Sequence, residues 1–291
     1  MRISGHTRAF AVLGHPISHT LSPVMHNAAF AALGMDAVYL PFDVEPSDLM
    51  RVLPAVRDMG FGGVNLTVPL KEIAFRGISD LDESARVLGS VNTVQFAAEG
   101  LKGFSTDGVG FVRALEEAFG ATPQGLDLFI LGCGGAGRAV AIASAQQGAR
   151  RIVLADVDTP RCGKLAAEIA AIAPQASTET AGPDTQKWDT AALAADIVVQ
   201  ATPIGMKPED KSVLTTAAFR PGQMAFDLVY NLPQTSFMRS ALAAGARVVN
   251  GLGMLLHQGA ASFTIWTGRP APVDVMREAL SAALYGPPVA H

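Results

Sequence analysis

The chain has 291 residues, of which 49% are hydrophobic and only 16% are charged, whereas about 25% are charged in an average soluble domain. This composition excludes a disordered, highly solvated chain, and the length favours two domains. Its 22 Lys and Arg residues against 26 Asp and Glu give a net charge of −4 without a basic stripe, so we expect no nucleic-acid partner.

The first half of the chain alternates short β-type runs with helical patterns, which predicts parallel strands joined by crossover helices. Pro23 opens the first helix at a position where its missing N–H costs little, and Gly34 ends it. Glu99 and Gly100 mark the turn of a predicted hairpin. In chain order, the predicted elements are a strand at 9–13, a helix at 22–33, a strand at 37–44, a helix at 47–59, a strand at 63–67 and hairpin strands at 91–96 and 101–103.

The second half repeats this alternation more clearly, and a helix at 108–119 links it to the first half. We place a domain boundary near Asp107, at the start of that helix. The remaining predicted elements are strands at 126–131, 151–155, 197–201, 224–229 and 246–249, a helix at 137–147, and two helices in the tail at 254–263 and 273–284.

Neither a membrane segment nor a metal site is indicated. No apolar run reaches the roughly 18 residues of a membrane span, and the run at 9–13 is too short for a signal-peptide core, so we expect a cytoplasmic protein. The two cysteines, Cys133 and Cys162, cannot build a disulfide framework or a four-thiolate site. The six histidines lack metal-ligand spacing, and we expect no metal.

A glycine-rich turn at 132–137 indicates a nucleotide site. It fits G-x-G-x-x-G, follows an apolar strand and opens a helix, and the next strand ends at Asp156, 24 residues after Gly132. The glycines permit a tight turn and close approach of a pyrophosphate, which free N–H groups at the helix end would bind. The predicted nucleotide-binding residues of the turn are Gly132, Gly134, Gly135, Ala136 and Gly137. The alternative is a glycine-rich turn without a ligand.

Asp156 bears on which nucleotide binds. A carboxylate there can accept hydrogen bonds from the ribose hydroxyls of NAD, but it would repel the 2′-phosphate of NADP by about 4 kcal/mol per charge pair at 4 Å before screening. Arg161 could offset this repulsion if it folds back, and Arg150 and Arg151 precede the strand. We therefore predict NAD, with NADP as the alternative cofactor. Asp156 could also simply end a strand.

Six polar motifs follow one another along almost the whole chain. They lie at 14–23, 65–71, 90–93, 105–108, 227–231 and 251–258. Together, in this order, they resemble the shikimate dehydrogenase family, including its quinate/shikimate branch. The resemblance implies an α/β protein of two domains: an N-terminal α/β substrate domain at 1–107 plus 255–291, and a Rossmann-type, doubly wound dinucleotide-binding domain at 108–254. It also implies an active site in the cleft between them.

The same resemblance implies reversible hydride transfer between shikimate and a nicotinamide, with a role in the shikimate pathway of aromatic amino acid biosynthesis. Lys71 and Asp107 match the family's catalytic pair. At its ordinary pKa a lysine acts as a cation at the reacting oxygen; the alternative is that burial lowers the pKa of Lys71 and makes it a base, which a nearby Asp107 would oppose. We expect a small-molecule substrate and a monomer or homodimer.

Further residues match the family's binding positions. Those that would contact the substrate are Thr20 and Ser22 at its carboxylate and Asn65, Thr67, Asn92, Tyr230 and Gln258 around its ring hydroxyls. Those on the cofactor side are Asp156, Arg161, Thr202, Leu228, Gly251 and Met254. For some of them a structural role is the alternative: Ser22 or Asp107 could cap a helix, and Lys71 could be a surface residue.

Three departures put the substrate range in doubt. Thr20 replaces the Ser that is common in biosynthetic members, Ser105 stands where Asn is frequent, and Asp156-Val157 resembles the NAD-using quinate/shikimate branch. We therefore expect an NAD-preferring shikimate dehydrogenase, and whether it acts on shikimate alone or on quinate as well stays open at this point. A non-catalytic relative, binding nucleotide or metabolite to regulate a partner, is the alternative.

Overall fold

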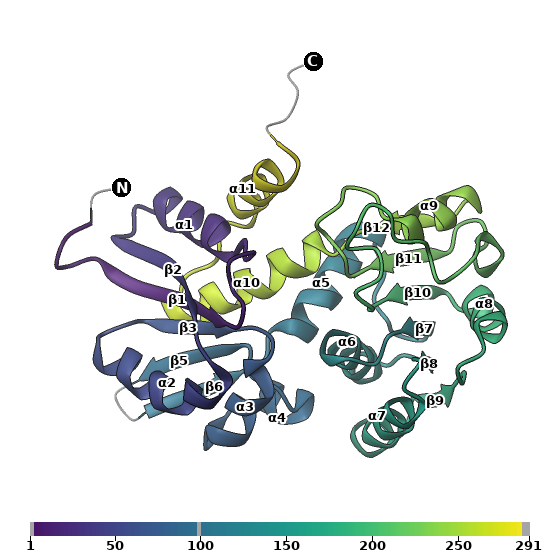
Figure 1. The fold of residues 1–291 in the computed structure, drawn as a ribbon, viewed down its shortest axis with the longest axis horizontal. Helices are drawn as coiled ribbons and strands as arrows, with labels where there is room; N and C mark the ends of the chain where they lie inside the picture. Colours follow the sequence, from purple (N-terminus) through teal and green to yellow (C-terminus); the bar gives the residue numbers. More distant parts are fainter. Residues whose placement is uncertain (1–2, 98–99, 287–291) are drawn as a thin grey trace. The chain divides into compact units, whose positions relative to one another are not determined.

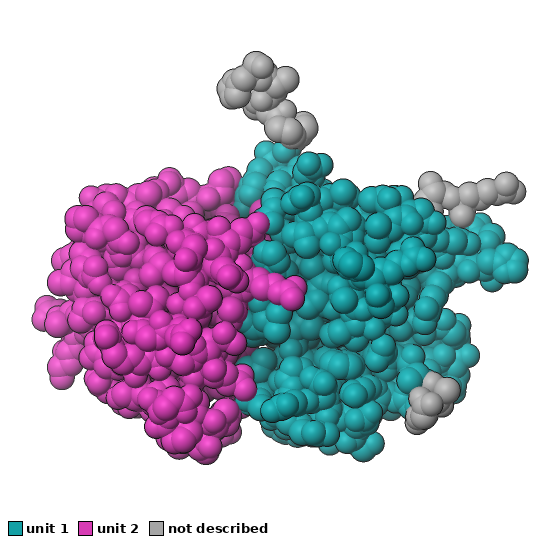
Figure 2. Space-filling model, turned by 180° about the vertical axis from the view of Figure 1, so that it is seen from behind, with its two compact units in different colours: residues 1–110, 256–291 teal, residues 111–255 magenta. Residues whose placement is uncertain are grey.

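The computed structural model describes residues 3–97 and 100–286. The chain folds into two compact units, which Figure 2 shows in different colours. Unit 1 comprises Met1–Gly110 and Leu256–His291, and unit 2 comprises Phe111–Leu255. Glu99, in the turn of the predicted hairpin, lies outside the described residues.

Unit 1 contains a mixed sheet in the order β2-β1-β3-β5-β6-β4 (Figure 1). β1, β2 and β3 are parallel, whereas β5 is antiparallel to both β3 and β6. Its strands are β1 (Arg8–Gly14), β2 (Ala37–Asp43), β3 (Gly63–Leu66), β4 (Asp80–Leu81), β5 (Thr93–Ala97) and β6 (Gly100–Phe104). Gly14 pairs with Asp43 and Leu13 with Leu66, so the carboxyl ends of the parallel strands lie together. Ligands of α/β sheets bind at such ends.

Helices from both ends of the chain complete unit 1. Phe10 of β1 packs against Phe30, with ring centroids 5.2 Å apart, and against Trp266, at 5.4 Å. The two C-terminal helices thus return to the N-terminal sheet, and the last of them packs on the first helix. The helices are α1 (Ser22–Ala32), η1 (Pro46–Asp48), α2 (Leu49–Asp58), α3 (Leu70–Gly77), α4 (Glu83–Leu88), α10 (Leu252–Thr267) and α11 (Val273–Tyr285). Burial of these large apolar side chains stabilises the unit.

Unit 2 contains a fully parallel sheet in the order β12-β11-β10-β7-β8-β9. Counted within the unit, this is the order 6-5-4-1-2-3 of a doubly wound dinucleotide-binding fold, whose order reverses between β7 and β10. The strands are β7 (Asp127–Leu131), β8 (Arg151–Ala155), β9 (Ser177–Thr180), β10 (Ile197–Gln200), β11 (Met224–Asp227) and β12 (Arg247–Val249). The central strands are buried on both faces, as a parallel sheet requires.

The helices of unit 2 connect these strands. They are α5 (Asp107–Phe119), which crosses the boundary between the units, α6 (Gly135–Gln146), α7 (Thr159–Ile172), α8 (Thr185–Ala194), η2 (Thr216–Ala218) and α9 (Ser236–Ala243). Trp188, Phe219 and Phe237 are buried in the core between helices and sheet. Over the described residues, no helix combines the length and apolarity needed to cross a bilayer.

Candidate active site

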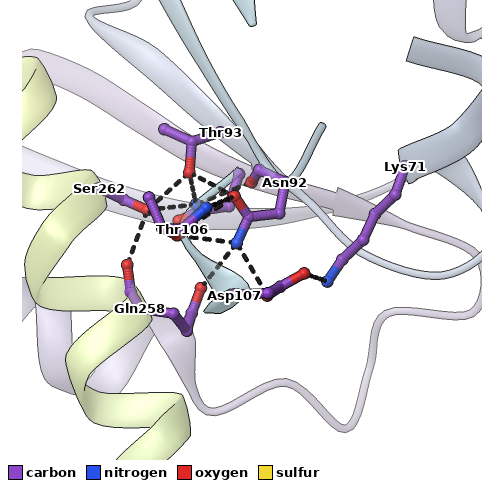
Figure 3. A network of polar contacts seen from close by, with 8 residues as sticks. Lys71, Asn92, Thr93, Thr106, Asp107, Gln258 and Ser262 are labelled. Carbon is purple, nitrogen blue, oxygen red and sulfur yellow. Dashed lines mark hydrogen bonds and ion pairs between the residues drawn. The ribbon is translucent and has the colours of Figure 1, made fainter. Parts of the chain in front are cut away.

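A lysine and an aspartate face each other in unit 1. Lys71 is the second residue of α3, directly after β3, and Asp107 is the first residue of α5. The Lys71 Nζ donates to Asp107 Oδ2 at 2.6 Å, and the two side chains are 27% and 12% exposed (Figure 3). The Asp107 carboxylate accepts hydrogen bonds from Lys71 and from the side-chain amide of Asn92. An ion pair that is mostly buried yet still open to solvent can hold a ligand hydroxyl and exchange a proton with it.

Asn92 holds Asp107 in place. This residue is 1% exposed, and its Nδ2 donates to Asp107 Oδ1 at 3.0 Å, to Thr106 Oγ1 at 2.8 Å and to Gln258 Oε1 at 3.2 Å. Its Oδ1 accepts from the backbone N–H of Thr106 at 2.8 Å. The amide therefore joins the Lys71–Asp107 pair to a side chain of α10, and removing it would leave buried groups unpaired.

A serine that was not among the predicted site residues anchors the other side of this network. Ser262 is fully buried on α10, one helical turn after Gln258, and it donates to the Gln258 carbonyl at 3.0 Å. Its oxygen accepts from Asn65 Nδ2 at 2.9 Å, and it shares a hydrogen bond of 2.7 Å with the Thr93 hydroxyl. Figure 3 shows Ser262 beside Thr93 and Thr106. Its i, i+4 spacing from Gln258 places both side chains on one face of the helix, and this was the sequence signal that could have indicated Ser262.

Asn65 is oriented by its neighbours. Its Nδ2 donates to the Asn92 carbonyl at 3.0 Å, so its Oδ1 must face the other way, where it accepts from the buried Tyr39 hydroxyl at 2.7 Å. Ser22 hydrogen-bonds to the same phenol, and burial raises the pKa of Tyr39 well above its ordinary value. Asn65 therefore has mainly one lone pair of Oδ1 to offer a ligand hydroxyl.

The remaining predicted residues of unit 1 lie at the strand ends. Ser22 is the first residue of α1, and Leu21, not Ser22, occupies the N-cap position, without a side-chain cap. The capping alternative for Ser22 is therefore wrong, because the helix begins one residue too early for it. The Thr20 Oγ1 accepts from the Ser22 N–H at 3.3 Å. Thr67 follows β3, and its methyl lies where a side chain on Gly14 would be.

Unit 2 carries the glycine turn between β7 and α6. Gly132 adopts φ +99°, which favours glycine, and a Cβ on Gly137 would collide with the Gly132 carbonyl. Side chains at Gly134 and Gly135, by contrast, would meet nothing within 4 Å, and Gly135 and Ala136 are exposed. The turn is thus tight on its inner side and open on its outer side, at the N-terminus of a helix where anions bind.

Asp156 directly follows β8 and ties two segments together. Its Oδ2 accepts from the Cys133 N–H at 2.7 Å and its Oδ1 from the Asp158 N–H at 2.9 Å. Arg161 folds back toward it, with Nη1 at 3.8 Å, and pairs with Asp158 at 3.0 Å. Arg150 instead lies 2.7 Å from Asp127, at the opposite end of the sheet.

Four weaker predictions for the cofactor side also fall in unit 2. Thr202 packs on Gly132, and its N–H donates to Gln200 Oε1 at 2.7 Å. Gly251 approaches the Leu228 backbone so closely that any Cβ would collide with it. The half-buried Met254 lies in the first turn of α10. These positions place the carboxyl ends of β10 and β11 beside the glycine turn, as the doubly wound order requires.

Tyr230 also belongs to unit 2, whereas the other predicted substrate residues belong to unit 1. It follows a turn that Asp227 holds by accepting from the Val229 N–H and from Thr235, and burial raises the pKa of Asp227 to about 6. Burial likewise raises the pKa of Tyr230. Within the described ranges, no three His, Cys, Asp or Glu side chains gather as metal ligands would.

The doubly wound sheet with its glycine turn, and the separate α/β unit with its lysine–carboxylate pair, are the features of a dinucleotide-dependent oxidoreductase. Family models agree: the shikimate dehydrogenase substrate binding domain matches residues 12–94, and the Shikimate 5′-dehydrogenase C-terminal domain matches residues 251–280. The chain belongs to the shikimate dehydrogenase family.

Individual relatives cover nearly the whole chain. The shikimate dehydrogenase (NADP(+)) of Moorella thermoacetica is 45% identical, over 99% of this chain and 98% of its own. The crystal structure of Listeria monocytogenes shikimate 5-dehydrogenase with shikimate and NAD is 35% identical, with a TM-score of 0.90, over 96% and 98% of the chains. Quinate dehydrogenase from Corynebacterium glutamicum with NAD is 31% identical, with a TM-score of 0.87, over 95% and 99%.

Proposed function

We propose that this chain catalyses reversible hydride transfer between a nicotinamide dinucleotide and shikimate, interconverting shikimate and 3-dehydroshikimate. The observation that carries the proposal is the Lys71–Asp107 pair at 2.6 Å, held by Asn92 in a chain that also has a dinucleotide turn. Unit 1 would bind the substrate and unit 2 the nucleotide. No contact or sequence feature favours the alternative of a non-catalytic regulator.

The residues of unit 1 would divide the work. The nicotinamide, when bound, supplies or accepts the hydride. Lys71 would place its ammonium at the ketone oxygen, stabilise the developing negative charge and deliver the proton. Asp107 would accept a hydrogen bond from the same hydroxyl and keep Lys71 in place. Asn65 and Gln258 would pair the ring hydroxyls, and this pairing rejects analogues that lack them.

A Lys71→Ala variant tests the catalytic assignment. Without the cation, we expect kcat for shikimate oxidation to fall by about 10³-fold or more, since the developing charge loses its main counterpart. Lys187→Ala, which removes an exposed lysine of α8, is the matched control and should keep full activity. Retention of activity in the Lys71 variant would contradict the assignment, provided that both variants bind nucleotide.

We further propose that NAD is preferred over NADP, although the Moorella relative is named for NADP(+). The support is local charge. Asp156 and Asp158 carry two negative charges against the single positive charge of Arg161. A 2′-phosphate would add further negative charge beside them, whereas ribose hydroxyls could donate to the remaining lone pairs of Asp156.

Asp156→Asn tests this preference. Removing one of the two negative charges should raise the NADP-to-NAD ratio of kcat/KM by about 10–100-fold, because the repulsion of the 2′-phosphate weakens while one acceptor oxygen remains. Asp184→Asn, at the N-cap of α8, removes a carboxylate of the same unit and should leave the ratio unchanged. An unchanged ratio in the Asp156 variant would overturn the proposed preference.

Quinate is proposed as a second substrate. The support is Thr20 at the expected carboxylate end and the Asp156-Val157 pair, together with the similarity to the Corynebacterium quinate dehydrogenase. Initial rates with shikimate or quinate, each with NAD or NADP, measure both proposals at once. Activity confined to shikimate with NADP would reject both the NAD preference and the quinate activity.

A further inference from the structure

The two cysteines of the chain are neighbours at the nucleotide turn. Cys133 lies between Gly132 and Gly134, and Cys162 lies in the first turn of α7. Their sulfur atoms are 3.5 Å apart, both residues are free thiols, and they are 3% and 2% exposed. No step of the proposed hydride transfer uses either thiol.

Exposed residues lie close to both buried cysteines in the chain. Arg161 and Gly163, which flank Cys162, are exposed, and so are Gly135 and Ala136 of the glycine turn. A small neutral oxidant such as hydrogen peroxide would reach the sulfur atoms through local opening of these segments. Once one thiol is oxidised, its partner is already in van der Waals contact, which makes the second step effectively unimolecular.

Cys162 is the better placed of the two to react first. Burial raises the pKa of both thiols, which slows the reaction. Opposing this, Cys162 lies at the positive N-terminal end of the 14-residue helix α7, and this position and the hydrogen bond from the Cys133 thiol favour a thiolate, whereas the Asp156 and Asp158 carboxylates raise the pKa of Cys162. Cys133 then acts as the resolving thiol.

We propose that Cys133 and Cys162 form a peroxide-sensitive dithiol whose oxidation weakens nucleotide binding. The Cys162 thiolate attacks one peroxide oxygen, which breaks the O–O bond and leaves a sulfenic acid and, after proton transfer, water. Cys133 then attacks the sulfenic sulfur, which forms the disulfide and releases a second water. In total, two thiols and one H₂O₂ give one disulfide and two waters, and a thiol reductant reverses the change.

Formation of the disulfide would affect nucleotide binding because it would move residues that lie near Asp156. A disulfide needs a sulfur–sulfur distance of about 2.05 Å, so the two thiols must approach by about 1.5 Å. The glycine turn cannot yield, because Gly137 already packs directly against the Gly132 carbonyl. We expect the first turn of α7 to take up this movement, and that turn carries Arg161 and follows the N-cap Asp158, both of which contact Asp156.

Mass spectrometry tests the chemistry independently of activity. Trypsin should place Cys133 in peptide 114–138 and Cys162 in peptide 162–164. After treatment of the purified chain with hydrogen peroxide, we expect these peptides to be linked, and dithiothreitol to separate them. Cys162→Ala and Cys133→Ala are matched controls in which the link cannot form. Separate sulfinic or sulfonic peptides without the link would overturn the proposal.

Titration with NAD, followed by calorimetry, tests the consequence. We expect the oxidised protein to bind NAD about tenfold more weakly than the reduced protein, as expected for the loss of one good polar contact, and the peroxide-treated Cys162→Ala variant to show no change. A linked protein with unchanged NAD affinity would overturn the effect on binding. The effect on NAD binding rests on the proposed function, whereas the cross-link does not. If the reduced protein binds neither NAD nor NADP, the proposed nucleotide role is rejected. Mass spectrometry then still shows whether Cys133 and Cys162 form a disulfide.

Discussion

At the residue scale, His26 is a buried polar side chain that the proposed chemistry does not use. It is fully buried on α1, stacks on Tyr39 at a centroid distance of 4.3 Å, and lies against Trp266. Both ring nitrogens lack a hydrogen-bond partner among the described residues. Burial lowers the pKa of His26 from 6.5 to about 3. The folded state therefore holds this histidine neutral, at a cost in free energy.

This histidine makes the stability of the protein depend on pH. His26 takes up a proton near pH 6.5 in the unfolded chain but only near pH 3 in the folded protein. His26 therefore does not reduce the unfolding free energy above pH 6.5, and it lowers that free energy progressively as the pH falls from 6.5 toward 3. Between pH 7 and pH 5, His26 should cost about 2 kcal/mol of unfolding free energy. A His26→Phe variant keeps the stacking and should lose this component. Denaturant unfolding at the two pH values measures it, and an equal loss in both proteins would contradict the assignment.

Ser262 shows at the same scale how one hydroxyl can organise a site. It donates to the Gln258 carbonyl, accepts from Asn65 and shares a hydrogen bond with the Thr93 hydroxyl. All these groups are buried or half-buried, so each depends on the others for its hydrogen bonds. The position of Asn92, and through it that of Asp107, therefore depends on Ser262 of α10.

At the element scale, the contact between β7 and α6 decides the shape of the nucleotide turn. Gly137→Ala should lower the unfolding free energy of unit 2 by about 3 kcal/mol, because its methyl would collide with the Gly132 carbonyl. Gly163→Ala, in the exposed face of α7 with nothing within 4 Å, should raise it by about 0.5–1 kcal/mol. Thermal unfolding distinguishes the two, and the same sign in both variants would contradict the close-packing argument.

At the scale of the whole molecule, the two units carry separate halves of the proposed site, and hydrogen exchange can locate them. We expect NAD to protect 132–137 and 156–162 in unit 2, because the glycine turn and Asp156 would contact the nucleotide. Shikimate should protect 65–71 and 92–107 in unit 1. Protection of the unit 1 segments by NAD alone, without shikimate, would contradict this division of roles.

Most of the fold follows from local sequence patterns. The alternation of apolar strands and glycine-ended helices predicted the parallel strands of both units, and the glycine turn with Asp156 predicted the start of a doubly wound sheet. The sequence missed short elements such as α4 and β9, whose six and four residues are too few for a clear period. The predicted start of α6 is two residues late. The helix begins at Gly135, although glycine lowers helix propensity.

By itself, the sequence determined the motifs, their order and the chemical groups that they supply, because strand ends and glycine turns are local properties. Only the tertiary structure decided which groups meet. Lys71 and Asp107 are 36 residues apart, and Asn65 and Ser262 are 197 apart, yet each pair is hydrogen-bonded. The same holds for the Cys133–Cys162 contact and for the fold-back of Arg161 onto Asp156. Such contacts arise from the sheet order and the return of the C-terminal helices, which depend on packing over the whole chain rather than on any local pattern.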